Sequence, residues 1–337
     1  MTAYYRPVAR FGEVPTSGSF PLAGGLCWFD TVAVHRRAGG VHHIPAPDVP
    51  DDVLERLTAK RAPIAGLDMH VPQLMGILNV TPDSFSDGGQ FNAPDAALTH
   101  ARRMQAEGAT IIDIGGESTR PGAAEVPVAE EIARTAPVIA AIRAESAVPI
   151  SIDTRKAPVG EAAVNAGATL INDVAAFTFD PALADVAART GLPVCLMHAQ
   201  GDPATMQVDP RYDDVLLDVY DFLAERVAAA VAAGIPRDRI VVDPGIGFGK
   251  TIDHNLTLLR GIAIFHGLGC PILLGASRKR FIGVIGGGQD AADRVSGSVA
   301  AALFAARRGV QILRVHDIFA TKQALEVEWA IGGAGMT

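Results

Sequence analysis

Eight short apolar segments, separated by stretches with helical periodicity, constrain the fold of this chain more than any other feature. They are Leu74–Val80, Thr110–Gly115, Pro149–Thr154, Thr169–Val174, Pro193–His198, Ile240–Pro244, Pro271–Ala276 and Ile312–His316. Short segments that are apolar throughout are typical of parallel strands buried on both faces, with helices covering the sheet. Eight such units over residues 73–337 predict a (β/α)8 TIM barrel, and a doubly wound open α/β sheet is the alternative.

The helical periodicity is clearest between the fifth and sixth strands. Apolar residues recur there at spacings of three and four from Asp213 to Gly234, which predicts an amphipathic helix. A pair of aspartates precedes this stretch and a glycine and a proline follow it, as is typical of helix ends.

Residues 1–72 lack this alternation and are expected to form an amino-terminal appendage. Its apolar segments Cys27–Arg37 and Val41–Ile44 flank a glycine-rich turn and predict a β-hairpin. A linker and a short helix at Asp51–Lys60 then lead into the barrel. We expect this appendage to cap the amino-terminal end of the barrel.

The composition argues against several classes of partner. The formal charge of −8 and the pI near 5.6 disfavour an extended nucleic-acid surface or a polybasic membrane anchor. No apolar run approaches the length of a membrane span, and no targeting segment is recognisable. The three cysteines are isolated in the sequence, which argues against a disulfide framework and fits a reducing cytoplasm. We therefore expect small-molecule substrates.

Polar residues end or follow seven of the eight predicted strands. They are Asn79, the segment Gly116–Gly122, Asp153-Thr154, Asn172-Asp173, Asp243, Ser277-Arg278-Lys279, and Arg314 with His316. Each has an ordinary structural explanation, such as capping the next helix. In a (β/α)8 barrel, however, the carboxyl ends of the strands share one rim, where reactive groups gather. Agreement at seven strand ends predicts an active site at this rim.

The first of these strands runs directly into an unusually polar loop. The segment Met75–Gly89 reads MGILNVTPDSFSDGG and combines a buried strand with hydroxyls, carboxylates and turn residues. Pro82 lacks an N–H group and disfavours helix before it, so regular structure should stop there. This pattern favours a catalytic loop over an ordinary surface connection.

The seventh and eighth strands indicate a phosphate site. Arg314 and His316 are two residues apart on one strand and point to the same side, close to Ser277-Arg278-Lys279. Arginine and lysine together suit a pyrophosphate, and an Arg–Asp network at the barrel mouth is the alternative. The segment Gly245–Thr251 is one residue too short for a P-loop and is interpreted as a tight loop packed against a ligand.

The carboxylates and the amide indicate a flat heterocycle. One carboxylate can accept from adjacent N–H and NH₂ groups of a pyrimidine edge, and Asp243 is the candidate. Asp153 and Asn172 would complete the polar pattern, and Lys279 would donate to the opposite edge. No zinc-type ligand spacing occurs, so we expect any metal to be Mg²⁺ held mainly by substrate phosphates.

Several motifs together resemble the dihydropteroate synthase family, over residues 73–330 and in the family's order. They are Met75–Gly89, Gly115–Ala123 (GGESTRPGA), Ile152–Thr154, Ile171–Val174, Val242–Lys250 (VDPGIGFGK), Gly275–Gly283 (GASRKRFIG) and Arg314–Asp317 (RVHD). The resemblance implies a folate-biosynthetic transferase that joins 6-hydroxymethyl-7,8-dihydropterin pyrophosphate to p-aminobenzoate and releases pyrophosphate and 7,8-dihydropteroate. It also implies competition by sulfonamides.

The resemblance assigns roles position by position. It implies a pterin-binding set of Asp153, Asn172, Met197, Asp243, Phe248 and Lys279. It implies pyrophosphate contacts from Asn79, Thr119, Arg278, Arg314 and His316, with Asn79 also helping to hold Mg²⁺. It implies p-aminobenzoate contacts from Phe85, Ser86, Arg120, Pro121 and Ser277. The implied catalytic residues are Asp87, Thr119, Arg120, Asp153 and Lys279.

Two other functions remain open at the level of sequence. A methyltetrahydrofolate-dependent methyltransferase barrel shares the pterin carboxylates but has no use for a pyrophosphate site. A catalytically silent pterin-binding barrel is the other alternative. Small residues in the predicted helix Ala291–Gly309 would permit close subunit packing, and the resemblance favours a homodimer.

Overall fold

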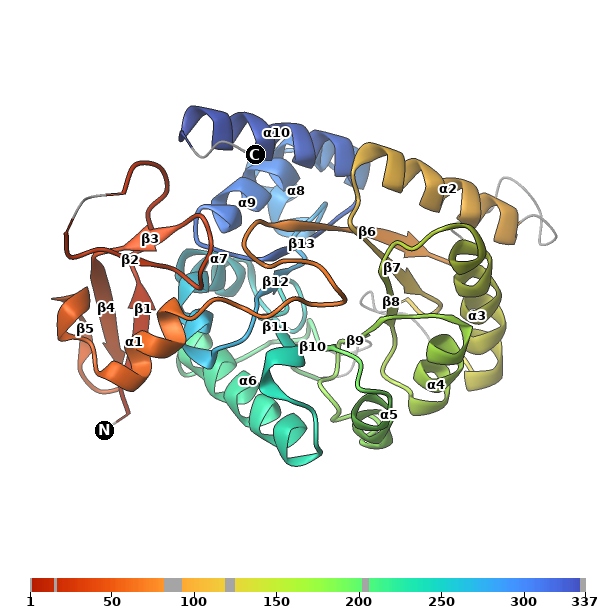
Figure 1. Cartoon of the computed structure of the whole chain (residues 1–337), viewed down its shortest axis with the longest axis horizontal. Helices are drawn as coiled ribbons and strands as arrows, with labels where there is room; N and C mark the ends of the chain where they lie inside the picture. The colour runs from red at the N-terminus through yellow and green to blue at the C-terminus, as the bar shows by residue number, and fades with distance from the viewer. Residues whose placement is uncertain (1, 15–16, 82–92, 119–124, 202–205, 334–337) are drawn as a thin grey trace.

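The computed structural model describes residues 2–14, 17–81, 93–118, 125–201 and 206–333. Its main body is a parallel β-barrel surrounded by helices, with a small antiparallel sheet at one side (Figure 1). The barrel strands hydrogen-bond in the order β11-β10-β9-β8-β7-β6-β13-β12. A parallel bridge between Val242 and Ile272 closes β11 onto β12. The (β/α)8 barrel is therefore confirmed, because an open doubly wound sheet would leave both edges unpaired.

Each barrel strand begins and ends within two residues of a predicted apolar segment. The strands are β6 (Gln73–Asn79), β7 (Ile111–Gly115), β8 (Ile150–Asp153), β9 (Leu170–Asp173), β10 (Val194–Met197), β11 (Ile240–Asp243), β12 (Leu273–Leu274) and β13 (Ile312–Val315). Their outward-facing side chains pack against the helices and form the main hydrophobic core.

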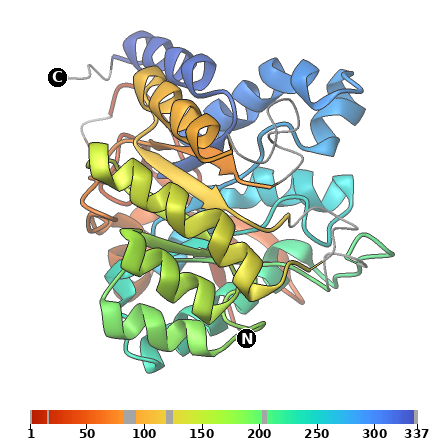
Figure 2. The same cartoon turned by 90° about the vertical axis from the view of Figure 1, so that its right-hand side faces the viewer.

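Helices follow the strands and lie along the outside of the barrel (Figure 2). They are α2 (Ala93–Glu107), α3 (Val128–Glu145), α4 (Ala157–Ala166), α5 (Ala182–Thr190), α6 (Val215–Ala232), α7 (Ile252–Gly261), α8 (Arg280–Gly286), α9 (Val295–Ala306) and α10 (Ile318–Ile331), with 3₁₀ turns η3 (Arg237–Arg239), η4 (Ile262–Leu268) and η5 (Ala291–Arg294). The helix predicted from Asp213 is confirmed as α6, and the Asp214 carboxylate caps it by accepting from two backbone N–H groups. Within the described ranges, none of these helices combines the length and apolar character that a membrane crossing requires.

The inside of the barrel divides into an apolar half and a polar half. Inward-facing side chains at the amino ends of the strands form an apolar cluster of Met75, Ile111, Leu170, Cys195, Val241, Leu273 and Ile312. Ile64 and Met69 from the linker before β6 belong to the same cluster and are almost fully buried. The linker thus closes the amino-terminal end of the barrel, and the polar side chains occupy the other end.

The appendage consists of two small sheets and a helix. Its elements are β1 (Tyr4–Pro7), β2 (Phe20–Pro21), β3 (Trp28–Phe29), β4 (Thr31–Arg36), β5 (Gly40–Pro45), η1 (Ala46–Asp48) and α1 (Asp51–Thr58). The predicted hairpin is confirmed as β4 and β5, which pair in antiparallel fashion. Its first arm is shorter than expected, because Asp30 separates β3 from β4, and β1 adds a third strand that was not predicted.

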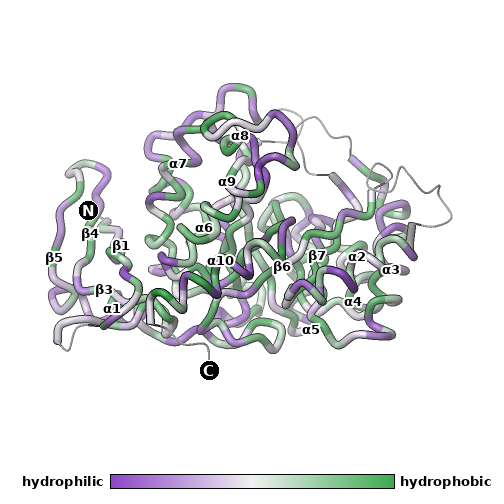
Figure 3. The backbone as a smooth tube through the Cα atoms, turned by 90° about the horizontal axis from the view of Figure 1, so that it is seen from above, coloured by the Kyte–Doolittle hydropathy of each residue, from purple (hydrophilic) through white to green (hydrophobic). Residues whose placement is uncertain are grey.

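The appendage packs against the flank of the barrel, beside α6 and the 3₁₀ turn η4 (Figure 3). The ring of Tyr4 meets that of Tyr220 edge to face, with centroids 5.4 Å apart. Arg37 forms ion pairs with Asp218 (2.6 Å) and Asp221 (2.7 Å) of α6. The antiparallel sheet therefore covers a side of the barrel, and only the linker covers its end.

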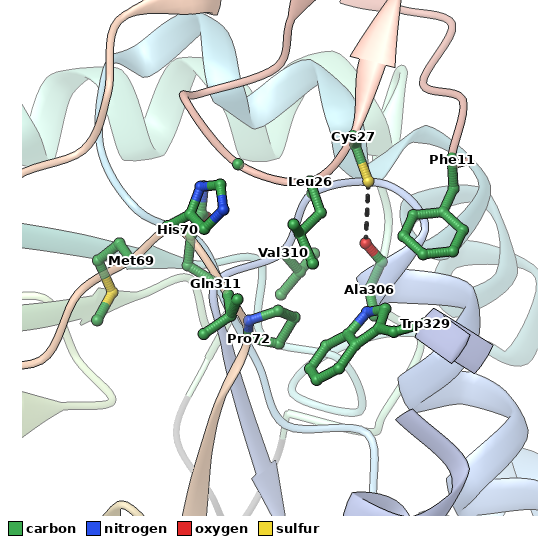
Figure 4. A pocket seen from close by; sticks show the side chains of 13 residues that line it. Phe11, Leu26, Cys27, Met69, His70, Pro72, Ala306, Val310, Gln311 and Trp329 are labelled. Carbon is green, nitrogen blue, oxygen red and sulfur yellow. Dashed lines mark hydrogen bonds between the residues drawn. The ribbon is translucent and has the colours of Figure 1, made fainter. Parts of the chain in front are cut away.

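A small hollow lies where the appendage meets α9, α10 and the linker (Figure 4). Its walls are largely apolar and include Phe11, Leu26 and Trp329. The Cys27 thiol beside it donates to the carbonyl of Ala306 at 3.3 Å. None of the predicted site residues lines this hollow, so it is separate from the rim at the carboxyl ends of the strands.

Candidate active site

An arginine shared by two aspartates lies in the polar half of the barrel. Arg314 on β13 donates through Nε to Asp113 on β7 (2.6 Å) and through Nη2 to Asp153 at the end of β8 (2.9 Å). The amide of Asn172 on β9 also approaches Asp113, at 3.4 Å. The Arg–Asp network that the sequence left as an alternative is therefore present at the mouth of the barrel.

One carboxyl of this cluster, that of Asp153, has a pKa close to neutral pH. Burial raises the pKa of Asp153 to about 7, with repulsion from Asp113 adding to the shift and the Arg314 charge opposing it. Burial alone would lower the pKa of Arg314, but the two carboxylates outweigh it and raise that pKa above its ordinary value. Arg314 thus stays charged, while Asp153 can change its protonation state.

Asp243 at the end of β11 provides a second buried carboxylate. It pairs in register with Met197 on β10, and its Oδ1 accepts from the backbone N–H of Gly245 at 2.7 Å. Burial raises the pKa of Asp243, and the nearby Lys279 charge opposes this. A Cβ atom on Gly275 would lie 3.9 Å from both Oδ2 of Asp243 and Cδ of Arg314, so the missing side chain leaves space between these groups.

Lys279 is held by the loop that follows β11. Its Nζ donates to the carbonyl of Ile246 and lies 4.5 Å from the centroid of the Phe248 ring. Burial lowers the pKa of Lys279 to about 8, although Asp243 acts in the opposite direction. The structure therefore brings the predicted pterin-binding residues together at one end of the barrel with Arg314. They are Asp153, Asn172, Met197, Asp243, Phe248 and Lys279.

Asn79 lies beside Asp153 at the rim. A Cβ atom on Gly115 would be 3.7 Å from Oδ1 of Asn79 and 3.8 Å from Oδ2 of Asp153. Because Gly115 has no side chain, Oδ1 of Asn79 and Oδ2 of Asp153 both border the space that a larger residue would fill. The described residues contain no cluster of three or more His, Cys, Asp or Glu side chains that would form an all-protein metal site.

Ser277 and His316, predicted to bind different substrates, are in contact. The Oγ atom of Ser277 is 3.1 Å from Nδ1 of His316 and accepts from the His316 backbone N–H at 3.2 Å. Ser277 is buried and His316 partly buried. The p-aminobenzoate and pyrophosphate positions that the sequence predicts are thus adjacent on the rim.

Arg278 occupies a turn that is fixed from two sides. Its φ of 57° is in the left-handed region, which is unfavourable for a residue other than glycine. Its backbone N–H donates to Ser298 at 2.8 Å, and its guanidinium pairs with Asp317 through two hydrogen bonds. A pyrophosphate contact from Arg278 would therefore have to share this guanidinium with Asp317.

The remaining predicted site residues lie outside the described residues. They are Phe85, Ser86 and Asp87 of the first loop and Thr119, Arg120 and Pro121 of the second. Their assigned roles stay predictions.

Asp113 was missed at the level of sequence. It lies inside β7 rather than at its end, in the segment IIDIG, and is fully buried. The two-residue period of a strand places it on the same inward side as Ile111 and Gly115. A carboxylate at such a position in an otherwise apolar strand was the available signal.

A second buried charge network, also missed, lies behind the second and third strands. The Lys156 amine pairs with Glu131 (2.8 Å) and Glu117 (3.2 Å) and donates to the carbonyl of Val126 at 2.6 Å. Glu117 in turn accepts from the backbone N–H of Val126 at 3.1 Å. The network joins the end of β7 to the segment that begins α3.

Comparison with known proteins places this chain in a class of enzymes. Residues 75–316 match the family model described as pterin binding enzyme. The dihydropteroate synthase of Escherichia coli K12 is 50% identical over 262 residues, which cover 77% of this chain and 92% of that protein.

Two solved structures extend the likeness to three dimensions. Xanthomonas albilineans dihydropteroate synthase with 4-aminobenzoic acid has a TM-score of 0.76 and 50% identity, covering 80% of this chain and 97% of that one. Yersinia pestis dihydropteroate synthase with a sulfonamide drug has a TM-score of 0.75 and 49% identity, with the same coverage. The chain therefore belongs to the pterin-binding enzyme family and, within it, to the dihydropteroate synthases.

Proposed function

We propose that this protein condenses 6-hydroxymethyl-7,8-dihydropterin pyrophosphate with p-aminobenzoate, releasing pyrophosphate and 7,8-dihydropteroate. The observation that carries this proposal is the group of polar side chains at the carboxyl-terminal rim, in which Asp153, Asn172 and Asp243 are buried and Lys279 and Arg314 are partly buried. The p-aminobenzoic acid and the sulfonamide bound by the two similar enzymes support the same second substrate.

The pterin ring would be recognised by complementary donors and acceptors. The Asp243 carboxylate would accept from the adjacent ring N–H and NH₂ groups, since among the described residues its one backbone donor is Gly245, on Oδ1. Asn172 and Asp153 face the same space from neighbouring strands. Lys279 would donate to the acceptor edge of the ring, and the ring of Phe248, over which the Lys279 amine lies, would supply an apolar contact.

The leaving pyrophosphate would lie over the last two strands. Ser277 and His316 offer polar hydrogen-bonding groups there, and Arg278 offers a cation shared with Asp317. We propose Arg314 as a further source of positive charge beneath this position, because its two carboxylate partners leave part of the side chain exposed.

The side-chain oxygens beside Gly115 fit the coordination that Mg²⁺ prefers. Asn79 would hold the ion together with substrate phosphate oxygens, since Mg²⁺ commonly uses few protein ligands. Bound there, the ion would neutralise negative charge on the leaving pyrophosphate.

The proposed reaction is a displacement at the pterin methylene carbon. The bond from this carbon to the pyrophosphate oxygen breaks, and its electron pair leaves with the pyrophosphate. The amino nitrogen of p-aminobenzoate forms the new C–N bond and then loses one proton to solvent. Ionised Asp153 would stabilise positive charge that develops on the ring and methylene, because it lies in a buried site of low polarity. Asp87, Thr119 and Arg120 are proposed to contribute from the two loops.

An assay of product formation tests this function. Purified protein should release pyrophosphate only when the pterin substrate, p-aminobenzoate and Mg²⁺ are all present, and mass spectrometry should identify 7,8-dihydropteroate. A sulfonamide should compete with p-aminobenzoate. Binding of the pterin without any pteroate formation would instead favour a catalytically silent pterin-binding protein.

We also propose that the protein is a cytoplasmic homodimer. The free and buried state of Cys27, Cys195 and Cys270 supports a reducing compartment. The neighbouring helices α8, α9 and α10 support a subunit interface, because Ile285 and Phe319 on two of them are exposed apolar residues. Sedimentation should show a dimer at micromolar concentration, and a monomer would contradict this assembly.

A further inference from the structure

A buried amine beside the candidate site has no part in the roles assigned so far. Lys250 is only 3% exposed, and its Nζ donates to Nδ1 of His198 (2.8 Å) and to the carbonyl of Phe248 (2.9 Å). These two acceptors and the more distant carbonyl of His198 (3.4 Å) are all neutral, so no carboxylate in the described part of the chain bonds this amine directly. Burial lowers the pKa of Lys250 well below its ordinary value, and burial with the Lys250 charge lowers that of His198 to about 2. Burying an amine costs free energy, which its hydrogen bonds only partly offset. We therefore expect these bonds to serve a structural purpose.

The lysine bonds join the loop after β11 to the end of β10. Residues 245, 247 and 249 of this loop are glycines with φ of 67°, 86° and 61°, a backbone shape that other residues adopt at a cost. A Cβ atom on Gly245 would overlap the carbonyl oxygen of His198, so the loop lies directly on this residue. The His198 ring is itself packed edge to face against Phe222, with centroids 4.8 Å apart. Lys250 thus ties the carbonyl of Phe248 to a ring that is already fixed.

The same loop supplies the two direct partners described for Lys279. The Lys279 amine donates to the carbonyl of Ile246 and lies over the ring of Phe248. A Cβ atom on Gly247 would lie 3.1 Å from Cδ of Lys279, so this side chain also crosses the loop closely. A change in the loop should therefore move the lysine that is proposed to bind the pterin ring.

We propose that Lys250 is a positioning residue for pterin binding: it fixes the loop 245–250 and, through Ile246 and Phe248, the position of the Lys279 amine. Lys250 itself does not touch the pterin. This inference rests on the proposed function, and it assigns to Lys250 an effect on affinity that passes mostly through Lys279, with Phe248 carrying the remainder.

A double-mutant cycle separates this role from a merely structural one. The measured quantity is the dissociation constant of 6-hydroxymethyl-7,8-dihydropterin pyrophosphate, by titration calorimetry of the full-length protein. Lys250→Met should weaken binding about tenfold in the unaltered background, a loss of about 1.4 kcal/mol. In the Lys279→Met background the same substitution should weaken binding less than twofold. An equal loss in both backgrounds, or no loss in either, would overturn the proposal.

Two further variants keep the test decisive. Arg61→Met is the matched control, because Arg61 is a buried cation (4% exposed) that donates to backbone carbonyls including those of Arg56 and His266, away from the rim. It should lower the unfolding temperature and leave pterin affinity unchanged.

If Lys250→Met does not fold, His198→Phe is the substitute variant. It removes the acceptor Nδ1, keeps an aromatic ring against Phe222, and should weaken pterin binding in the same way. Unchanged affinity of His198→Phe would contradict the proposal, whereas absence of pterin binding by the unaltered protein would contradict the proposed function itself.

Discussion

The two ends of the barrel interior use the same strands for opposite purposes. At the amino ends, residues such as Met75, Ile111 and Leu170 pack with Ile64 and Met69 into a closed apolar cluster. At the carboxyl ends, inward positions on the same sheet hold Asp113 and Arg314, whose burial is costly. The difference indicates a division of labour within the barrel: one end packs into an apolar cluster, and we propose that the other end gives up packing to hold charged groups for a ligand.

Removing a charge from the polar end should have the largest effect on activity. Asp243→Asn keeps the size of the side chain and an oxygen that can accept from Gly245, but it cannot accept from two ring donors with a full charge. The loss of charged hydrogen bonds, about 4 kcal/mol in total, should lower kcat/KM for the pterin substrate roughly a thousandfold. The unfolding free energy should not fall, because a buried acid is removed. Activity within tenfold of the unaltered protein would contradict the role of Asp243.

Removing volume from the apolar end should have the converse effect. Met69→Ala would leave a cavity where the linker closes the barrel, since Met69 is 1% exposed. The free energy of unfolding should fall by about 2–5 kcal/mol, measured by urea denaturation. kcat/KM should stay within about twofold below the unfolding temperature. A large loss of activity in the folded variant would show that the two ends are not independent.

The ionisation of Asp153 gives a pH test confined to the polar end. Its folded pKa of about 7 means that the carboxylate is protonated as the pH falls, so kcat/KM should decline on the acid side of pH 7. Asp113→Asn removes a negative charge that repels the Asp153 carboxylate and competes with it for Arg314. The pKa of Asp153 should therefore fall. The acid limb should therefore move down by about one pH unit, or about 1.4 kcal/mol. Glu130→Gln, at an exposed residue of α3, is the control and should not move it. If the acid limb of the kcat/KM profile does not move in Asp113→Asn, the two aspartates are not coupled.

The appendage should contribute least. Arg37 is 41% exposed and pairs with two aspartates on α6. Arg37→Met should lower the unfolding free energy by less than about 1 kcal/mol, and by less at high salt, because exposed ion pairs are weak and screened. Thermal unfolding at low and high NaCl concentration measures this. An altered KM for either substrate would indicate that the appendage influences the rim.

The sequence predicts the apolar half of the barrel more completely than the polar half. Eight strands and the helix α6 follow from local periodicity, because buried parallel strands are apolar along their whole length. The break at Asp30 and the short β12 were not predicted, because they depend on how neighbouring segments pack. Residues 1–72 as a separate unit also remain a prediction.

Polar residues at strand ends were identified, but their partners were not. Arg278 has the sequence context of a phosphate ligand, yet its pairing with Asp317 depends on the turn that Ser298 fixes. Asp113 escaped notice because it lies within a strand, and Lys250 because its segment was interpreted only as a tight loop packed against a ligand, with no role for the lysine itself. Contacts between distant strands decide such pairings, and a single sequence does not contain them.

The position of the pterin substrate tests the division between the two ends most directly. A crystal structure of the protein with 6-hydroxymethyl-7,8-dihydropterin pyrophosphate should place the ring among Asn172, Asp243 and Lys279, with its pyrophosphate toward Ser277 and His316. Finding the ring instead in the hollow beside Trp329, or anywhere else away from the carboxyl-terminal rim, would contradict this interpretation.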